Sequence, residues 1–138
     1  GVDSQSGLAH SAVVTAANVH DKHPLPALLH GAEQRVYGDS AYASQKELIA
    51  GKAPRARDFT NQRVRRQGEI DEATRAKNRS KSRIRARVEH VFCVVKRLWG
   101  FAKVRYRGLA KNATRSFVVL GLANIYLGRQ RLMAQVCP

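Results

Sequence analysis

The feature that most constrains the fold is an apolar pattern near the middle of the chain. Apolar residues recur there at spacings of four, three, four and three, at Ile84, Val88, Val91, Val95 and Leu98. This spacing is typical of one face of an amphipathic α-helix. Phe92 and Trp99 widen the apolar stripe, and Gly100 is suited to end the helix. We therefore expect a helix over 83–98 with one buried face.

The predicted helix lies in a strongly basic part of the chain that contains one acid, Glu89. The 66 residues from 73 to 138 contain 16 Lys or Arg and no acid except Glu89. On a helical wheel, Arg85 and Lys96 lie within about 40° of Glu89, at the border of the apolar stripe. One interpretation is an exposed Arg85–Glu89 ion pair, worth only about 0.3–0.5 kcal/mol. The other is a carboxylate kept ionised by its neighbours and ready for a hard cation.

The first part of the chain predicts short strands and helices in alternation. We expect two strands around the turn SQSG, where Gly7 can take a positive φ, and a short helix or turn over 20–31. A strand at Val36 and Tyr37 then leads to an acid, Asp39. This order indicates an α/β layer fold, and such folds place their sites at the carboxyl ends of strands.

The segments that follow are assigned from local signals. SQKE at 44–47 matches a capping box, which predicts a helix that stops at Gly51. Residues 52–82 are polar and basic, and we expect an edge strand at 57–60 and then a partly mobile connection. FAKVRYRG at 101–108 predicts a short strand with Lys103, Arg105 and Arg107 on one face, because strand side chains alternate. A last helix is expected to be capped by Asn112 and to carry Phe117, Leu120, Ile125 and Leu127.

The net charge of the chain limits the kinds of molecule that it is suited to bind. The formal net charge is +15 and the sequence pI is about 10.9. Residues 1–51 hold three basic and five acidic residues, whereas residues 52–138 hold 22 basic and five acidic residues. Such a basic surface is suited to nucleic acid or to an anionic membrane surface. No apolar run reaches the roughly 20 residues of a membrane span. Cys93 and Cys137 lack the spacing of a metal site or a disulfide framework, which favours a reducing compartment.

Several motifs together resemble the bacterial insertion-sequence transposases that carry a DDE triad on a ribonuclease-H-like core. They include VYGDSAY around Asp39, RIRARVEHVFCVVKR around Glu89, and GFAKVRYRGLAKN. The family pattern YxxRxxxExxxxxxK is matched by Arg85, Glu89 and Lys96, with Ser82 in place of the Tyr. The resemblance extends over nearly the whole chain.

The resemblance implies a fold and a domain assignment. The fold would be α/β, a ribonuclease-H-like mixed sheet with flanking helices that lacks its first strand. Residues 1–138 would then be the C-terminal part of the catalytic domain, with the family's first Asp on the missing strand. Asp3 is not expected to replace it, because an Asp beside a turn usually forms local backbone hydrogen bonds.

The resemblance also implies a function. The parent protein would cleave and join DNA strands with Mg²⁺ or Mn²⁺ held by Asp39 and Glu89, and the chain as given would be inactive. Phosphates of double-stranded DNA, at the element ends and the target, would be bound by Arg85, Lys96, Lys103, Arg105 and Arg107. A homo-oligomer in the bacterial cytoplasm, at the nucleoid and not at a membrane, is expected. Two alternatives remain: a basic nucleic-acid-binding protein without catalysis, and an inert fragment.

Overall fold

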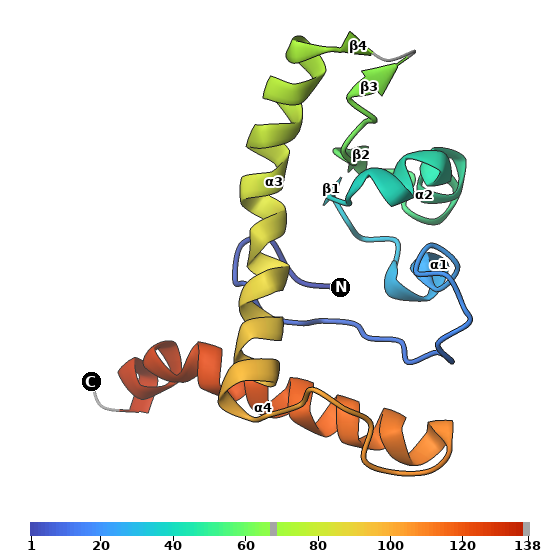
Figure 1. The fold of residues 1–138 in the computed structure, drawn as a ribbon. Coiled ribbons are helices and arrows are strands. Elements are labelled where there is room, and N and C mark those ends of the chain that lie inside the picture. The colour runs from blue at the N-terminus through green and yellow to red at the C-terminus, as the bar shows by residue number, and fades with distance from the viewer. Residues whose placement is uncertain (67–68, 137–138) are drawn as a thin grey trace. The chain divides into compact units, whose positions relative to one another are not determined.

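The computed structural model describes residues 1–66 and 69–136, which belong to two compact units (Figure 1). The first unit comprises Gly1–Ala17 and the chain from Arg87 onward, and the second comprises Asn18–Ala86. The arrangement is a helix-rich α/β fold, as expected. The strands described form two separate two-stranded sheets, so the expected larger mixed sheet is not present among these residues.

The second unit is built around a small parallel sheet. Strand β1 (Arg35–Val36) pairs in parallel with β2 (Arg57–Asp58). Parallel strands need a crossover connection, and here it consists of the 3₁₀ helix η1 (Ser40–Gln45) and helix α2 (Lys46–Lys52) (Figure 1). The expected strand, loop and helix order around Asp39 is therefore confirmed.

The capping box expected at 44–47 is not formed. Helix α2 begins at Lys46 after Gln45, with no side-chain cap, and continues through Gly51 to Lys52. The reason is that η1 already runs through Ser44, so Ser44 is inside a helical turn and not in the half-extended conformation of a capping residue.

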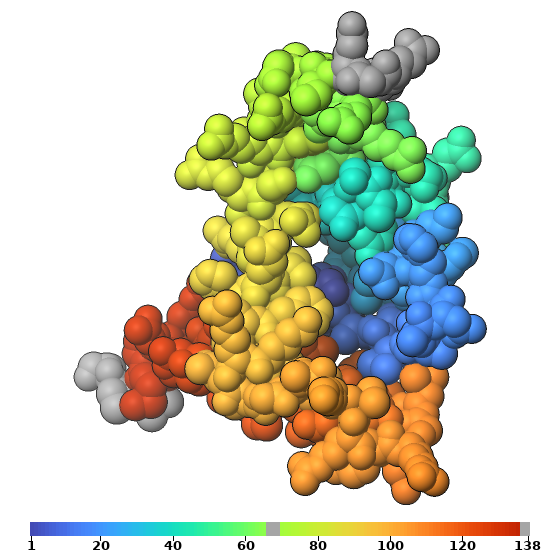
Figure 2. Space-filling view, in the orientation of Figure 1, coloured from blue at the N-terminus to red at the C-terminus, as the bar shows by residue number. Residues whose placement is uncertain are grey.

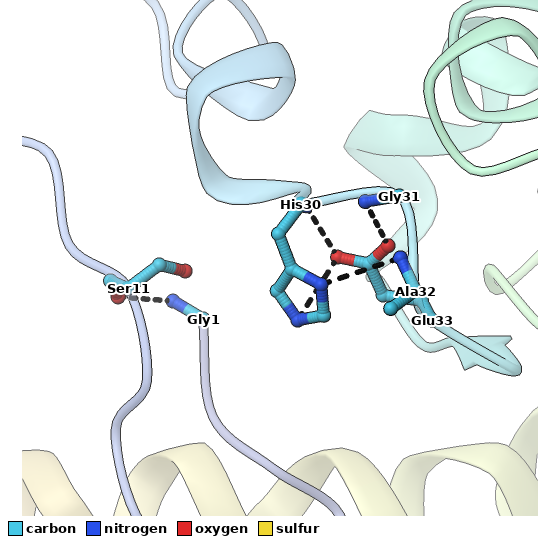
Figure 3. A network of polar contacts seen from close by, with 6 residues as sticks. All are labelled: Gly1, Ser11, His30, Gly31, Ala32 and Glu33. Carbon is cyan, nitrogen blue, oxygen red and sulfur yellow. Dashed lines mark hydrogen bonds and ion pairs between the residues drawn. The ribbon is translucent and has the colours of Figure 1, made fainter.

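The loop between helix α1 (Leu25–Leu28) and β1 is closed by Glu33. Its carboxylate accepts hydrogen bonds from the backbone N–H groups of His30 at 2.7 Å and Gly31 at 2.8 Å (Figure 3). Burial alone would raise the pKa of Glu33, but these N–H groups stabilise the carboxylate and hold its pKa below the ordinary value. Elsewhere in Figure 3, the amino terminus of Gly1 donates to the Ser11 carbonyl oxygen at 2.8 Å.

Helix α3 (Glu72–Cys93) starts well before the expected helix, within the stretch 52–82 assigned to a basic connection. Strands β3 (Arg65–Arg66) and β4 (Glu69–Ile70) pair in antiparallel fashion before it. Asp71 is its N-terminal cap, because the Asp71 carboxylate accepts the backbone N–H of Thr74 at 3.0 Å. Ala, Arg and Lys are strong helix formers, so the first turns need no apolar stripe.

A polar seam joins the first half of α3 to the residues after β2. Asn78 exchanges two hydrogen bonds with the backbone of Gln62, at 3.1 and 2.7 Å. The Lys81 ammonium donates to the Thr60 carbonyl oxygen at 3.0 Å. These positions recur at helical spacing, so one face of the helix is held by hydrogen bonds and not by apolar contact.

The first unit has its own hydrophobic core. Val91, Val94, Val95 and Ala123 are buried, and partly buried neighbours pack against them, namely Val2, Ala9, Phe101, Val119, Leu120 and Leu127. The buried members of the predicted stripe are thus Val91 and Val95. Phe92 is 50% exposed and Leu98 is 56% exposed, so the expectation was wrong for them. A π-helical turn, η2 (Val94–Leu98), widens the helix after Cys93, so the regular spacing that placed Leu98 on the stripe does not apply there, whereas Phe92 precedes this turn.

The start of the chain packs on this core as a turn. Val2 and Ala9 form an isolated antiparallel bridge, so the two expected strands are reduced to one pair. Gly7 has a φ of 74°, as the turn requires. The Asn124 side chain accepts from the Ala9 N–H at 2.8 Å and donates to the Ala9 carbonyl oxygen at 2.7 Å. Arg87 donates to the carbonyl oxygens of the same turn, at Ser4 and Gln5.

The segment 101–108 is a loop, not the expected strand, and helix α4 (Leu109–Val136) follows it. Asn112 lies inside α4 and is not its terminal cap. Its amide instead donates to the carbonyl oxygens of Tyr106 and Gly108, and its oxygen accepts the Tyr106 N–H. In the described part of the chain no strand pairs with this segment. Asn112 holds the end of the loop from within the helix instead. Phe117 and Ile125 of α4 are exposed.

Candidate functional site

Asp39 stands three residues after β1, at the carboxyl end of the parallel pair, and caps η1. Its Oδ1 accepts the Ala41 N–H at 2.9 Å, and its carbonyl oxygen accepts the Tyr42 N–H at 3.2 Å. One carboxylate oxygen is thereby used for local structure. The cap fixes the direction of the side chain, which is what a carboxylate needs if it is to bind a cation in a defined place.

The backbone before Asp39 is packed tightly against the chain after β2. The Asn61 N–H donates to the Gly38 carbonyl oxygen at 3.0 Å, which continues the ladder of the parallel strands. A Cβ atom on Gly38 would lie 2.7 Å from Cγ2 of Thr60, which is almost fully buried. Only glycine therefore fits at position 38 without displacing Thr60, and the position of Asp39 depends on that fit.

The pKa of Tyr42 is affected by its burial and by two neighbouring carboxylates, one of which belongs to Asp39. Burial raises the pKa of Tyr42, and the carboxylates of Asp21 and Asp39 raise it further. The phenol therefore stays protonated at neutral pH, and it donates to the Asp21 carbonyl oxygen at 3.3 Å. Tyr42 connects the capping turn of Asp39 to the segment before α1.

Glu89 is an exposed residue of α3 in the first unit, whereas Asp39 belongs to the second unit. A shared site for the two carboxylates stays a prediction. Arg85 lies one helical turn before Glu89 on the regular part of α3, at the spacing that was expected.

The place of Lys96 beside Glu89 stays a prediction. Lys96 lies within η2, the π-helical turn that follows Cys93. Its ammonium lies 5.6 Å from the centre of the ring of Phe92, four residues before it, at cation–π distance.

The three cations expected on one face of a strand lie on a loop. Lys103, Arg105 and Arg107 are all exposed, and Figure 2 shows the segment before α4, in orange, at the molecular surface with its side chains projecting outward. Strand alternation no longer relates them, because the segment is not extended. Their grouping is determined by the shape of the loop.

Asp3 has the local role that was expected. Its carboxylate accepts hydrogen bonds from the Ser6 hydroxyl and the Ser6 N–H, both at 2.6 Å. These bonds, the hydroxyl first, hold the pKa of Asp3 below its ordinary value.

The donor chemistry near Asp39 fits a hard divalent cation in part. Residues 1–66 and 69–136 contain no group of three or more His, Cys, Asp or Glu that could hold a metal ion. Asp39 nevertheless offers a carboxylate, the ligand type that Mg²⁺ and Mn²⁺ prefer. Asn61, whose N–H binds the carbonyl oxygen of Gly38, carries a buried Oδ1 without a hydrogen-bond partner among the described residues, and such acceptors are rare in proteins.

Sequence reasoning missed several residues that shape the site. Nδ2 of Asn61 donates to Oγ of Ser82 at 3.0 Å. Ser82 occupies the position at which the transposase pattern has Tyr. Arg115 and Arg87 organise loops through carbonyl oxygens. No apolar period or motif marks these residues, because their partners are backbone atoms distant in the sequence. Cys93 is exposed with a free thiol, and Cys137 lies outside the described residues.

Comparison with known proteins identifies one family. The model of the transposase DDE domain matches residues 1–125, which include Asp39, Glu89 and all five cations expected at the DNA. No solved structure matches the chain. In the described part of the chain, none of the helices has both the length and the hydrophobicity that crossing a bilayer requires.

Proposed function

The chain belongs to the transposase DDE domain family, and from that premise we propose that it contributes two metal-binding carboxylates, Asp39 and Glu89, to DNA strand cleavage and strand transfer. The observation that carries the proposal is the family match over residues 1–125, in which Asp39 follows a strand of a parallel pair by three residues and caps η1. Glu89 supports it as the single acid of residues 73–138. A purely DNA-binding role is not favoured, because the matched family is defined by a catalytic domain.

The two carboxylates would have different surroundings. Asp39 is oriented by the Ala41 N–H through one oxygen, and the other oxygen would face the metal. Glu89 is exposed on a helix and is surrounded by cations in the sequence. Mg²⁺ or Mn²⁺ bound there would activate the attacking oxygen and stabilise the leaving oxygen of a phosphodiester.

The cations would bind and orient the DNA. Arg85 and Lys96 flank Glu89 along the helix, and Lys103, Arg105 and Arg107 extend the basic surface on the loop before α4. Lys and Arg that neutralise phosphates release counterions, so affinity for duplex DNA would fall steeply as salt rises. Assembly into a homo-oligomer on the two element ends belongs to the same proposal.

The experiment compares matched carboxylate variants in two assays. Asp39→Asn and Glu89→Gln keep side-chain size and remove charge, and Glu47→Gln is the control, because Glu47 lies in the first turn of α2, outside the proposed site. Nicking of labelled element-end DNA is measured with Mg²⁺ and with Mn²⁺ in a chain extended upstream to include the family's first Asp, because the 138 residues alone are expected to be inactive. Duplex affinity is measured without metal.

Both site variants should lose nicking, whereas Glu47→Gln should retain it. Duplex affinity should be unchanged or tighter in Glu89→Gln, because a negative charge has been removed from a basic surface. Nicking that survives Asp39→Asn would refute the assignment. Loss of DNA binding in a folded Glu89→Gln protein would give Glu89 a role in binding rather than in chemistry.

A further inference from the structure

A shallow cavity of about 390 Å³, largely open to solvent, lies beside the N-terminal part of α4, wholly within the first unit. Its wall is formed by Gly100, Ala102, Lys103, Val104, Arg105 and Arg115. Three of these residues are cations and none is an acid. Arg107, which strand alternation would have grouped with Lys103 and Arg105, does not line it. Arg115, which comes from the helix, does.

Arg115 is held in place before any ligand arrives. Its guanidinium lies 4.6 Å from the centre of the Phe101 ring, and Nη1 donates to the Lys103 carbonyl oxygen at 3.3 Å. Phe101 in turn packs against the buried core of the unit. A guanidinium has five N–H donors in a fixed fork, so one bond to Lys103 leaves others for a ligand. A side chain that is already ordered loses less entropy when it binds.

The loop that forms the cavity is also fixed at both ends. At its start, the Phe101 N–H donates to the Val95 carbonyl oxygen at 3.1 Å, and Gly100 has a φ of 61°. At its end, Asn112 binds the backbone of Tyr106 and Gly108 through three hydrogen bonds. The cations of the cavity are therefore carried by a shaped loop and not by a free tail.

The surrounding charge favours an anion. The first unit contains ten Lys or Arg and two acids, Asp3 and Glu89. The Asp3 carboxylate is engaged by Ser6, and no acid follows Glu89 in the sequence. Like charges that converge on one cavity repel each other, and a bound anion removes that repulsion. The cavity is open to solvent, so the backbone of a duplex could approach it from outside.

We propose that this cavity binds one phosphodiester group of double-stranded DNA, with the Arg115 guanidinium as a fixed two-pronged donor and Lys103 and Arg105 as flanking charges. The proposal rests on the proposed function, which supplies DNA as the partner. The proposal adds Arg115 of α4 to the residues expected to bind DNA, and it leaves Arg107 out of this contact.

The same helix offers a matched control. The Arg129 guanidinium lies 4.2 Å from the centre of the Tyr126 ring, and its Nη1 donates to the Tyr126 carbonyl oxygen at 2.7 Å. Arg129 thus makes the same two kinds of contact as Arg115 but lines no part of this cavity. Comparing Arg115→Gln with Arg129→Gln separates a site from a general loss of positive charge.

The test measures affinity for a short fluorescent DNA duplex over a series of salt concentrations. Arg115→Gln should reduce the slope of log affinity against log salt by about 1, which corresponds to about fivefold weaker binding at roughly 0.15 M salt. Arg129→Gln should leave the slope unchanged. Lys103→Gln removes a cavity cation while its carbonyl oxygen still holds Arg115, so it should weaken binding even if Arg115→Gln disturbs the loop.

The outcomes separate this site from the proposed function. Equal slopes in Arg115→Gln and Arg129→Gln, with tight binding by the unaltered chain, would overturn the cavity and leave the transposase proposal intact. No duplex binding by the unaltered chain would defeat both. Titration with inorganic phosphate, followed by NMR of the Gly100 amide, separates the ligand sources. A Gly100 shift with phosphate that duplex DNA does not reproduce would identify a site for the free ion and overturn the proposal.

Discussion

Replacing Gly38 by Ala should destabilise the chain at the point where Asp39 is positioned. The added Cβ would lie 2.7 Å from Cγ2 of Thr60 and 3.2 Å from Cβ and Cδ2 of Tyr42. Thr60 is 1% exposed and β-branched, so it has neither space nor rotamer freedom to move aside. Inserting one methyl group into such a site costs about 1–3 kcal/mol of unfolding free energy.

Urea unfolding followed by circular dichroism measures this cost. Gly51→Ala is the control, because a Cβ at Gly51 meets nothing within 4 Å and the residue lies in α2. Ala is favoured over Gly in a helix by about 1 kcal/mol, so the control should be neutral or stabilised.

A second substitution tests the mechanism of the clash. Thr60→Ser removes Cγ2 but keeps the hydroxyl that donates to the Asp58 carboxylate. In a Thr60→Ser background, Gly38→Ala should therefore cost less, with a coupling of about 1 kcal/mol or more. Equal costs of Gly38→Ala in both backgrounds, or a cost no larger than that of Gly51→Ala, would refute the packing argument.

Two further predictions concern the start of the chain. Asn124→Ala should lower the unfolding free energy by about 1–3 kcal/mol, because two backbone groups of Ala9 lose their partner, whereas Asn18→Ala, at an exposed site, should change it by no more than about 0.5 kcal/mol in the same urea assay. The Asp3 carboxyl should titrate below its ordinary pKa in the folded chain, so its contribution to stability is complete above about pH 4 and is lost as pH falls through the folded pKa. Ser6→Ala should raise that pKa, measured by carboxyl-carbon NMR, and an unchanged pKa would contradict the hydrogen bonds as its cause.

The parts of the fold that sequence could predict are those governed by local rules. The turn at Gly7, the strand before Asp39 and the amphipathic character of the helix around Val91 follow from φ preference and apolar spacing. Asp39 was assigned to a strand end on the same grounds, and the structure confirms that location.

The parts that failed depend on partners distant in the sequence. The first half of α3 shows no apolar period, because its inner face binds the carbonyl oxygens and N–H groups of residues 60–62 through Asn78 and Lys81. Hydrophobic patterning does not detect such a polar seam. The expected strand at 101–108 is a loop instead, and Asn112 and Arg115 bind the carbonyl oxygens of Tyr106, Gly108 and Lys103 from within a helix.

The π-helical turn is a further feature that the apolar spacing did not predict. Lys96 lies within η2, and its ammonium lies over the ring of Phe92. The same turn supplies the Val95 carbonyl oxygen that receives the Phe101 N–H, and Phe101 is the ring on which Arg115 rests. The start of the loop that carries Lys103 and Arg105 is therefore held by a turn that apolar spacing does not reveal. Strand alternation groups Lys103 and Arg105 with Arg107, whereas the cavity groups them with Arg115, a residue 12 positions after Lys103 that reaches the loop from a helix.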